Sequence, residues 1–169
     1  GGLTVAREQH PLLAGTGLFD GDTFGSEHTI AGYEVDGALF EWVNGVPEVT
    51  GTDGTPLNFE ILAYTPAENR DFSGYGTTGV FQVETPENPG NGGKVFNAAT
   101  VDWADALWEY DRDRIADSQT SKIMLNVVND FSPGSLPSCS IDGGPGDHDS
   151  DRDGVYDICD NCVAEYNPG

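Results

Sequence analysis

Aspartate dominates the last 31 residues of the chain, which carry seven Asp and one Glu against a single arginine, Arg152. Residues 139–169 therefore have a net charge of −7, whereas residues 1–138 hold the other 21 acidic and six basic residues, a net of −15. Per residue, the tail is about twice as dense in negative charge as the body. Carboxylates this close repel one another unless a cation neutralises them. The tail is therefore expected to fold around a divalent cation and not around an apolar core.

The charge of the whole chain, −22 at a pI near 4.1, excludes several classes of function. A protein that binds the phosphates of nucleic acid needs clustered Lys and Arg, and so does one that binds an anionic membrane surface. The sequence also has no apolar run of the roughly 18 to 20 residues that a membrane span requires, so no membrane insertion is expected. The acidic body suits solubility in salty or calcium-rich surroundings, which predicts a secreted, extracellular or cell-surface protein.

Residues 149–160 have the spacing of a 12-residue calcium loop. Acidic side chains stand at loop positions 1, 3, 5, 9 and 12, and Gly154 stands at position 6, where the loop turns sharply. Ca²⁺ takes about six to eight oxygen ligands, and alternate residues of a tight loop can aim their oxygens at one point. The spacing predicts a calcium site formed by Asp149, Asp151, Asp153, the carbonyl of Val155, Asp157 and Asp160.

The loop departs from the usual pattern at one position, and two other interpretations of it remain open. Asp160 stands where such loops usually have a bidentate Glu, so its shorter side chain implies monodentate ligation or a tighter backbone. Mg²⁺ fits less well, because it prefers few carboxylates and keeps several waters. The remaining interpretation is an acidic linker that binds no metal.

The segment around the loop resembles a thrombospondin type 3 repeat. The residues that carry the resemblance are Asp147, Asp149, Asp151, Asp153-Gly154, Asp157, Cys159-Asp160-Asn161-Cys162 and Tyr166-Asn167-Pro168. The resemblance implies an extracellular segment that wraps around calcium ions with little apolar core. Such repeats commonly bind two ions, which would recruit Asp147 and Asn161 for the second. A single repeat is present, so it is interpreted as truncated, with neighbouring repeats or self-assembly partners beyond it.

The three cysteines, Cys139, Cys159 and Cys162, all lie near or inside this tail. Disulfides of the resembled repeats join successive repeats, which implies a Cys139–Cys159 bridge and leaves Cys162 without its partner. A local Cys159–Cys162 bridge and a free thiol are the alternatives. A zinc site is not expected, because three Cys without well-spaced His do not complete four ligands.

Turn residues divide residues 1–132 into short strands that precede one helix. Asn44-Gly45 is typical of a tight hairpin turn, Pro66 is expected to end a strand, and the Gly-rich stretch 72–76 is expected to be a loop. A short helix is expected near 102–108, capped by Thr100 or Asp102. Alternation of apolar residues predicts the strands 30–35, 38–43, 58–64, 79–84 and 94–99.

The clearest helix spans 119–131, where Ile123, Val127, Val128 and Phe131 recur at helical spacing. Ser118 or Thr120 is its expected N-cap. The pattern as a whole is mixed α/β. The tryptophans are expected to be core or interface aromatics in preference to a sugar-binding platform, and they are Trp42, Trp103 and Trp108.

A second resemblance covers most of residues 10–131. It rests on His10-Pro11-Leu12-Leu13, Gly15-Thr16-Gly17-Leu18, Asp20-Gly21-Asp22, Gly32-Tyr33-Glu34-Val35-Asp36-Gly37, Gly93 to Trp103, and Asn126-Val127-Val128. This order of motifs is similar to the C-terminal domain of the large (beta) subunit of N,N-dimethylformamidase-like proteins. The resemblance implies an α/β fold with a mixed sheet. It also implies a wider relation to class I glutamine-amidotransferase-like domains, whose last strand and helix resemble residues 94–131.

Enzymes of that family hydrolyse a small amide with a mononuclear iron held by Tyr and Glu side chains, which lie mainly upstream of the portion found here. The isolated chain is therefore not expected to be an enzyme. Glu34, in the Gly32-Tyr33-Glu34 motif, is the candidate catalytic carboxylate, because burial beside Tyr33 would tune it as an acid or base. The alternative is an ordinary carboxylate at the end of a strand.

The sequence thus predicts a dimethylformamidase-like domain over 1–132, a linker over 133–141 and a calcium-binding repeat over 142–169. The expected function is that of an extracellular module in which Ca²⁺ orders the tail as a spacer or contact element. The alternatives are part of an amide-hydrolysing enzyme and a subunit of an extracellular filament or adhesive assembly.

Overall fold

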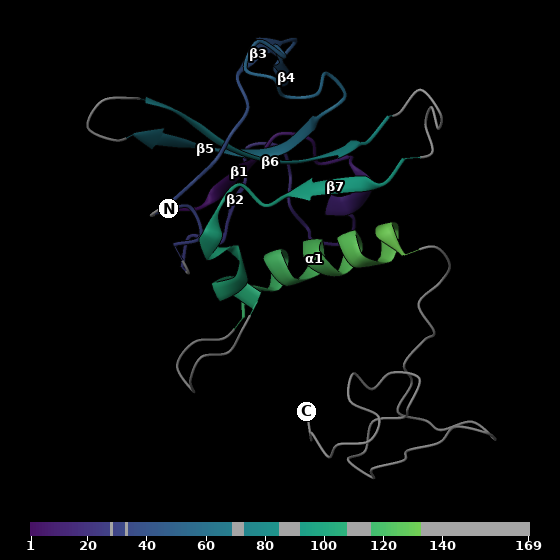
Figure 1. Ribbon diagram of the computed structural model, residues 1–169. Coiled ribbons are helices and arrows are strands. Elements are labelled where there is room, and N and C mark those ends of the chain that lie inside the picture. The colour runs from purple at the N-terminus through teal and green to yellow at the C-terminus, as the bar shows by residue number, and fades with distance from the viewer. Residues whose placement is uncertain (28, 33, 69–72, 85–91, 108–115, 133–169) are drawn as a thin grey trace, which may run out of the picture. The chain divides into compact units, whose positions relative to one another are not determined.

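The structure of the chain is a computed structural model (Figure 1), and it describes residues 1–27, 29–32, 34–68, 73–84, 92–107 and 116–132. The chain divides into two units, Gly1–Val128 and Asn129–Gly169. The described fold belongs to the first unit, and the description of the second ends at residue 132. The predicted linker and the predicted repeat lie outside the described residues, so the predicted domain boundaries stay predictions.

Seven strands form one sheet, and every pairing between described strands is antiparallel. The central strand β5 pairs with β6 along its length and with β1 and β4 over separate parts; β2 flanks β1, β3 flanks β4, and β7 flanks β6. The strands are β1 (Leu3–Val5), β2 (Thr23–Phe24), β3 (Phe40–Val43), β4 (Val46–Val49), β5 (Glu60–Glu68), β6 (Ser73–Gln82) and β7 (Lys94–Asn97).

Three helical segments accompany the sheet within the described residues: the 3₁₀ turns η1 (Pro11–Leu13) and η2 (Val101–Leu107), and the α-helix α1 (Ser118–Phe131). Figure 1 shows α1 running along one face of the sheet. Its buried residues, Thr120, Ile123 and Val127, follow the helical spacing of the sequence. The largest fully buried apolar side chains of the described core are Leu3, Val5, Leu12, Ile30, Ile61, Leu62 and Ile123.

Several predicted elements are confirmed. Asn44 and Gly45 both have positive φ, 53° and 84°, and join β3 to β4 in a tight hairpin, as the Asn-Gly signal requires. The strands β5 and β7 and the helix over 119–131 are also confirmed, and the Thr100 hydroxyl accepts a hydrogen bond from the Asp102 N–H at the start of η2. The coarse prediction of a fold that combines a sheet with helices holds. A glutamine-amidotransferase-like fold is not shown, and the antiparallel pairings offer no parallel strand to support it.

Four local predictions are wrong. Residues 30–35 do not form a strand: Thr29 has a φ of 55°, Ile30 fills the core from a turn, and only Val35 makes an isolated bridge, to Thr100. Pro66 does not end its strand, and β5 continues to Glu68. Pro66 lies beyond the residues of β5 that pair with β1 and β4, so the N–H that proline lacks costs little there.

The third wrong prediction concerns the Gly-rich stretch expected as a loop. From Ser73 onward it belongs to β6, which pairs residue by residue with β5. The N-cap of α1 also differs from the two expected residues, since the Thr120 N–H donates to the carboxylate of Asp117 at 2.7 Å. The strand around Ser73 is determined by its distant partner β5, whereas the cap is a local contact made by the residue directly before Ser118.

Candidate functional site

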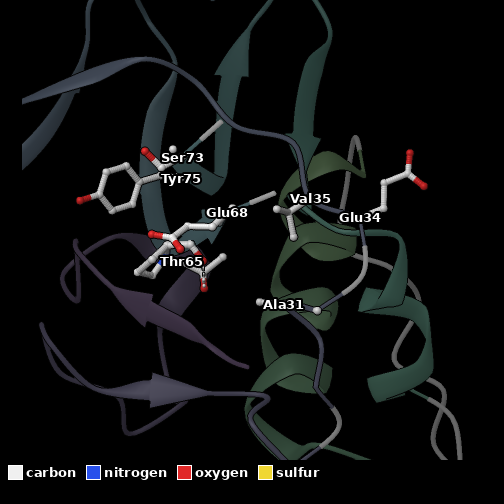
Figure 2. A pocket seen from close by; sticks show the side chains of 11 residues that line it. Ala31, Glu34, Val35, Thr65, Glu68, Ser73 and Tyr75 are labelled. Carbon is white, nitrogen blue, oxygen red and sulfur yellow. Dashed lines mark hydrogen bonds between the residues drawn. The ribbon is translucent and has the colours of Figure 1, made fainter. Parts of the chain in front are cut away.

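A cavity of about 450 Å³ lies at the end of the β5–β6 ladder where β5 ends at Glu68 and β6 begins at Ser73, and it faces Ala31, Gly32, Glu34 and Val35 (Figure 2). Its charged lining side chains, among the described residues, are both glutamates. The lining residues are Ala31, Gly32, Glu34, Val35, Thr65, Pro66, Ala67, Glu68, Ser73, Gly74 and Tyr75. The cavity is therefore polar and acidic on one side and bordered by an aromatic ring on the other.

The pairing register of β5 and β6 places the lining side chains. Pro66 stands opposite Tyr75, and Glu68 stands opposite Ser73. Residues two apart on a strand share a face, so these four side chains lie on the same face of the sheet. Figure 2 shows Glu68, Ser73 and Tyr75 near one another, which agrees with the register.

The opposite wall of the cavity comes from the segment that precedes β3. This segment runs along the edge of β6: the Thr77 N–H donates to the carbonyl of Asp36 at 3.0 Å, and the Ala38 N–H donates to the Thr77 hydroxyl at 2.9 Å. A Cβ at residue 37 would overlap the carbonyl oxygen of Tyr75, so only glycine permits this approach. Gly37 thus permits the segment before β3 to lie this close to β6, beside the cavity.

The predicted catalytic residue Glu34 lines this cavity but is exposed. Figure 2 shows its carboxylate pointing away from Glu68 and Tyr75. The burial on which an acid or base role was predicted is not present, and Tyr33 lies outside the described residues. The catalytic role of Glu34 therefore stays a prediction. Among the described lining residues, none is a second functional group in contact with its carboxylate.

A cluster of four aromatic rings adjoins the cavity through Tyr75. Tyr75 lies 5.0 Å from Phe40 and 5.9 Å from Tyr64, and Trp42 lies 5.5 Å from Phe40 and 5.3 Å from Tyr64, measured between ring centroids. The planes are inclined by 50–86°, so the rings meet in tilted and edge-to-face contacts. Phe40 also packs against the buried cluster of Ala38, Phe59 and Ile61. The other side of the cluster is open to solvent, with Trp42 51% and Tyr75 44% exposed.

A bulge in β5 makes this cluster possible. The register shifts between Ile61, which pairs with Gly79, and Ala63, which pairs with Thr78, so β5 has one extra residue here. Without it, Ile61 and Tyr64 would point to opposite faces, because residues three apart alternate. With it, Ile61 packs in the buried cluster that Phe40 joins, and Tyr64 contacts Phe40 directly.

The predicted metal ligands cannot be placed, because all of them lie outside the described residues; they are Asp147, Asp149, Asp151, Asp153, Val155, Asp157, Asp160 and Asn161. The three cysteines lie there too. Within the described ranges, no three His, Cys, Asp or Glu side chains come together as a group that could hold a metal ion. The same ranges contain no helix with the length and apolar character needed to cross a membrane.

Ser73 and Tyr75 were missed as cavity residues because the stretch 72–76 was expected to be a loop, and Glu68 was missed because Pro66 was expected to end its strand. Alternation of Ser73, Tyr75 and Thr77 was the available signal, but the glycines between them masked it. The exposed position of Trp42 also required the structure, since the same residue type is buried at Trp103.

Comparison with known proteins gives one family match over most of the chain. The model of the family described as "N,N-dimethylformamidase beta subunit-like, C-terminal" matches residues 1–116. Neither the comparison with curated proteins nor the comparison with solved structures gave a match.

Proposed function

The chain belongs to the N,N-dimethylformamidase beta subunit-like, C-terminal family, and we propose that it is an extracellular calcium-binding module built on a domain of that family. The observation that carries the proposal is the spacing of residues 149–160, with acidic side chains at five loop positions and Gly154 at the turn. The family match ends at residue 116, so the Asp-rich tail is a separate feature that needs its own explanation.

Physical chemistry supports a cation as the organising element of the tail. Residues 142–161 hold few apolar side chains, so their burial cannot offset the conformational entropy lost on ordering. Binding of Ca²⁺ would supply that free energy, because the ligand set forms only when the loop folds. The proposal therefore makes Ca²⁺ the switch between an unordered tail and a rigid spacer or contact element.

Isothermal titration of the full chain with Ca²⁺ tests this function. The wild type is expected to release or absorb heat on binding, and the double variant Asp151→Asn/Asp153→Asn is expected to lose it, since two adjacent ligands lose their charge. The matched control is Asp142→Asn/Glu165→Gln, which removes the same charge from tail residues outside the ligand set. Equal loss in both double variants, or no heat in the wild type, would refute a specific site.

Family membership favours a second candidate, participation in amide hydrolysis. The resemblance implies an iron held by Tyr and Glu, whereas the described residues gather no three His, Cys, Asp or Glu side chains as a metal site. The resemblance places these ligands mainly upstream of the portion found here, so the candidate concerns a larger protein, and the relation to glutamine-amidotransferase-like domains belongs to this candidate. Iron content and amide hydrolysis, measured on the longest protein that contains the chain, would support it; an iron-loaded protein without amide-hydrolysing activity would refute it.

Assembly into a filament or adhesive structure remains the third form of the proposal. Sedimentation velocity with and without Ca²⁺ tests it, because contact elements ordered by calcium would raise the sedimentation coefficient. A monomer under both conditions would leave the spacer role and remove the assembly role.

A further inference from the structure

The exposed aromatic surface beside the cavity has no part in the calcium proposal. We define the aromatic rim as Trp42, Tyr75 and Glu68. Trp42 and Tyr75 are about half exposed, whereas Phe24, Phe59 and Trp103 are buried to 95% or more. Glu68 pairs with Ser73, two positions along the ladder from the Pro66–Tyr75 pair. It therefore lies on the same face of the sheet as Tyr75, and it lines the same cavity. The rim therefore presents two rings and a carboxylate to solvent.

We propose that the aromatic rim binds a basic segment of a partner protein, with an arginine or lysine side chain stacked on the rings and paired with Glu68. A cation over the face of Trp or Tyr is attracted by the ring quadrupole, and a neighbouring carboxylate adds a charge-assisted hydrogen bond. The two charged lining residues of the adjacent cavity are Glu34 and Glu68, so a cation meets no like charge among the described lining residues.

The charge of the chain selects a basic occupant over a second copy. With 29 acidic and seven basic residues, each chain carries −22, and two copies brought together at this rim would repel one another. The same field steers a basic partner toward the surface and raises its rate of association. Charge complementarity thus favours a cationic segment, and it adds nothing to the binding of a neutral sugar.

The rings are held in place before any ligand arrives. Trp42 meets both Phe40 and Tyr64 edge to face, and Tyr75 contacts the same two rings at 5.0 and 5.9 Å. Because these contacts fix the ring orientations, a ligand that stacks on Trp42 or Tyr75 does not have to immobilise them. A rim of this kind can bind a side chain with little ordering cost.

Titration of the full chain with a Gly-Arg repeat peptide, followed by fluorescence or calorimetry in EDTA, tests the proposal. The substitutions Trp42→Ala and Tyr75→Ala leave the charge of the chain unchanged, so any loss measures the rings and not the general acidity. Each is expected to weaken binding about two- to fivefold, the value of an exposed cation–π contact. Tyr75→Phe keeps the ring and is expected to bind like the wild type.

Matched controls separate the rim from other acidic surfaces. Phe19→Ala removes a ring that is 65% exposed and lies outside the cluster, and it is expected to change nothing. Glu68→Gln is expected to weaken binding more than Glu41→Gln, which removes an equal charge from the opposite face of β3. Circular dichroism of every variant verifies that the fold is kept, and Tyr75→Phe against Tyr75→Ala decides the case if Trp42→Ala is unfolded.

Four outcomes would overturn the proposal. The first is equal affinity of Trp42→Ala, Tyr75→Ala and Phe19→Ala for the peptide. The second is equal binding of a Gly-citrulline peptide, which has the same shape without the charge. The third is binding of a neutral oligosaccharide that the ring substitutions abolish while peptide binding survives, and the fourth is self-association of the chain that the ring substitutions abolish. The calcium titration described above is independent of all four, so failure of one proposal does not decide the other.

Discussion

Two clusters of aromatic rings lie on opposite faces of the sheet and differ in what covers them. In the buried cluster, Trp103 of η2 lies 6.1 Å from Phe24 and 5.6 Å from Phe96, and it is 5% exposed. In the open cluster, Trp42 lies 5.3–5.5 Å from its two neighbours and is 51% exposed. The ring geometry is similar in both, so the contacts within a cluster do not decide whether it serves as core or as surface.

The strand register explains why the clusters face apart. Phe96 pairs with Val80 and shares its face, whereas Tyr75 shares a face with Phe81, the next residue after Val80. η2 supplies Trp103 to the first face, whereas among the described residues the second face carries the short β3–β4 hairpin and the segment that precedes it. In this fold, the elements that cover each face, and not the aromatic content of the strands, separate the buried cluster from the exposed one.

Truncation of Trp103 and of Trp42 is expected to give the largest difference in stability between the buried and the open cluster. Trp103→Ala is expected to lower the free energy of unfolding by about 3–5 kcal/mol, because a fully buried ring leaves a cavity. Trp42→Ala is expected to cost about 1–2 kcal/mol, because half of the side chain already contacts water and only two ring contacts are lost. Urea denaturation followed by circular dichroism measures both. Similar costs for the two variants would mean that the open cluster is covered in solution.

The hairpin that carries Trp42 offers a second test, through its turn. Gly45 has a φ of 84°, where a Cβ is strained, so Gly45→Ala is expected to cost about 1–2 kcal/mol. Gly93→Ala is the matched control, since a Cβ there meets no atom within 4 Å and its φ is not positive. The same variant should weaken binding at the aromatic rim, because the turn sets the position of Phe40 and Trp42. A loss of stability with unchanged peptide binding would separate the hairpin from the rim.

The cap of α1 provides a smaller test on the helical side. The Asp117 carboxylate accepts the Thr120 N–H at 2.7 Å, so Asp117→Ala is expected to cost about 1 kcal/mol. Ser118→Ala should cost much less, although Ser118 was one of the caps expected from the sequence. Thermal unfolding monitored at 222 nm distinguishes the two. A larger effect at Ser118 would show that the sequence-based cap is correct and the described contact is not.

These residues also show how far the sequence alone reaches. The Asn44-Gly45 turn and the spacing of Ile123 and Val127 depend on local chemistry, and both predicted structures are confirmed. The bulge at Leu62 depends on a paired strand and has no local signal, and the strand character of Ser73 had only an alternation that the neighbouring glycines masked. Because the aromatic rim depends on that bulge and on that strand, the sequence contained its residues without indicating that they meet.

Asp53 gives the smallest and most specific test, since it anchors the segment that leads into β3. Its carboxylate accepts hydrogen bonds from the N–H groups of Leu39 at 2.7 Å and Thr55 at 3.0 Å, and these bonds, that of Leu39 first, lower its pKa below the ordinary value of 3.8. A group whose pKa is lower in the folded state stabilises the fold above its unfolded-state pKa, and this contribution is lost as the pH falls through the folded-state value.

Asp53→Asn is therefore expected to lower the melting temperature slightly at neutral pH, with the difference from the wild type disappearing as the pH falls below about 4. Asp36→Asn removes the same charge from another exposed residue and is the control. Because Asp53 binds the backbone of Leu39, which directly precedes Phe40, the Asp53 variant should also weaken peptide binding at the rim. The buried cluster around Trp103 should keep its near-ultraviolet signal. A pH-independent difference would mean that the two backbone contacts do not depend on the charge of Asp53.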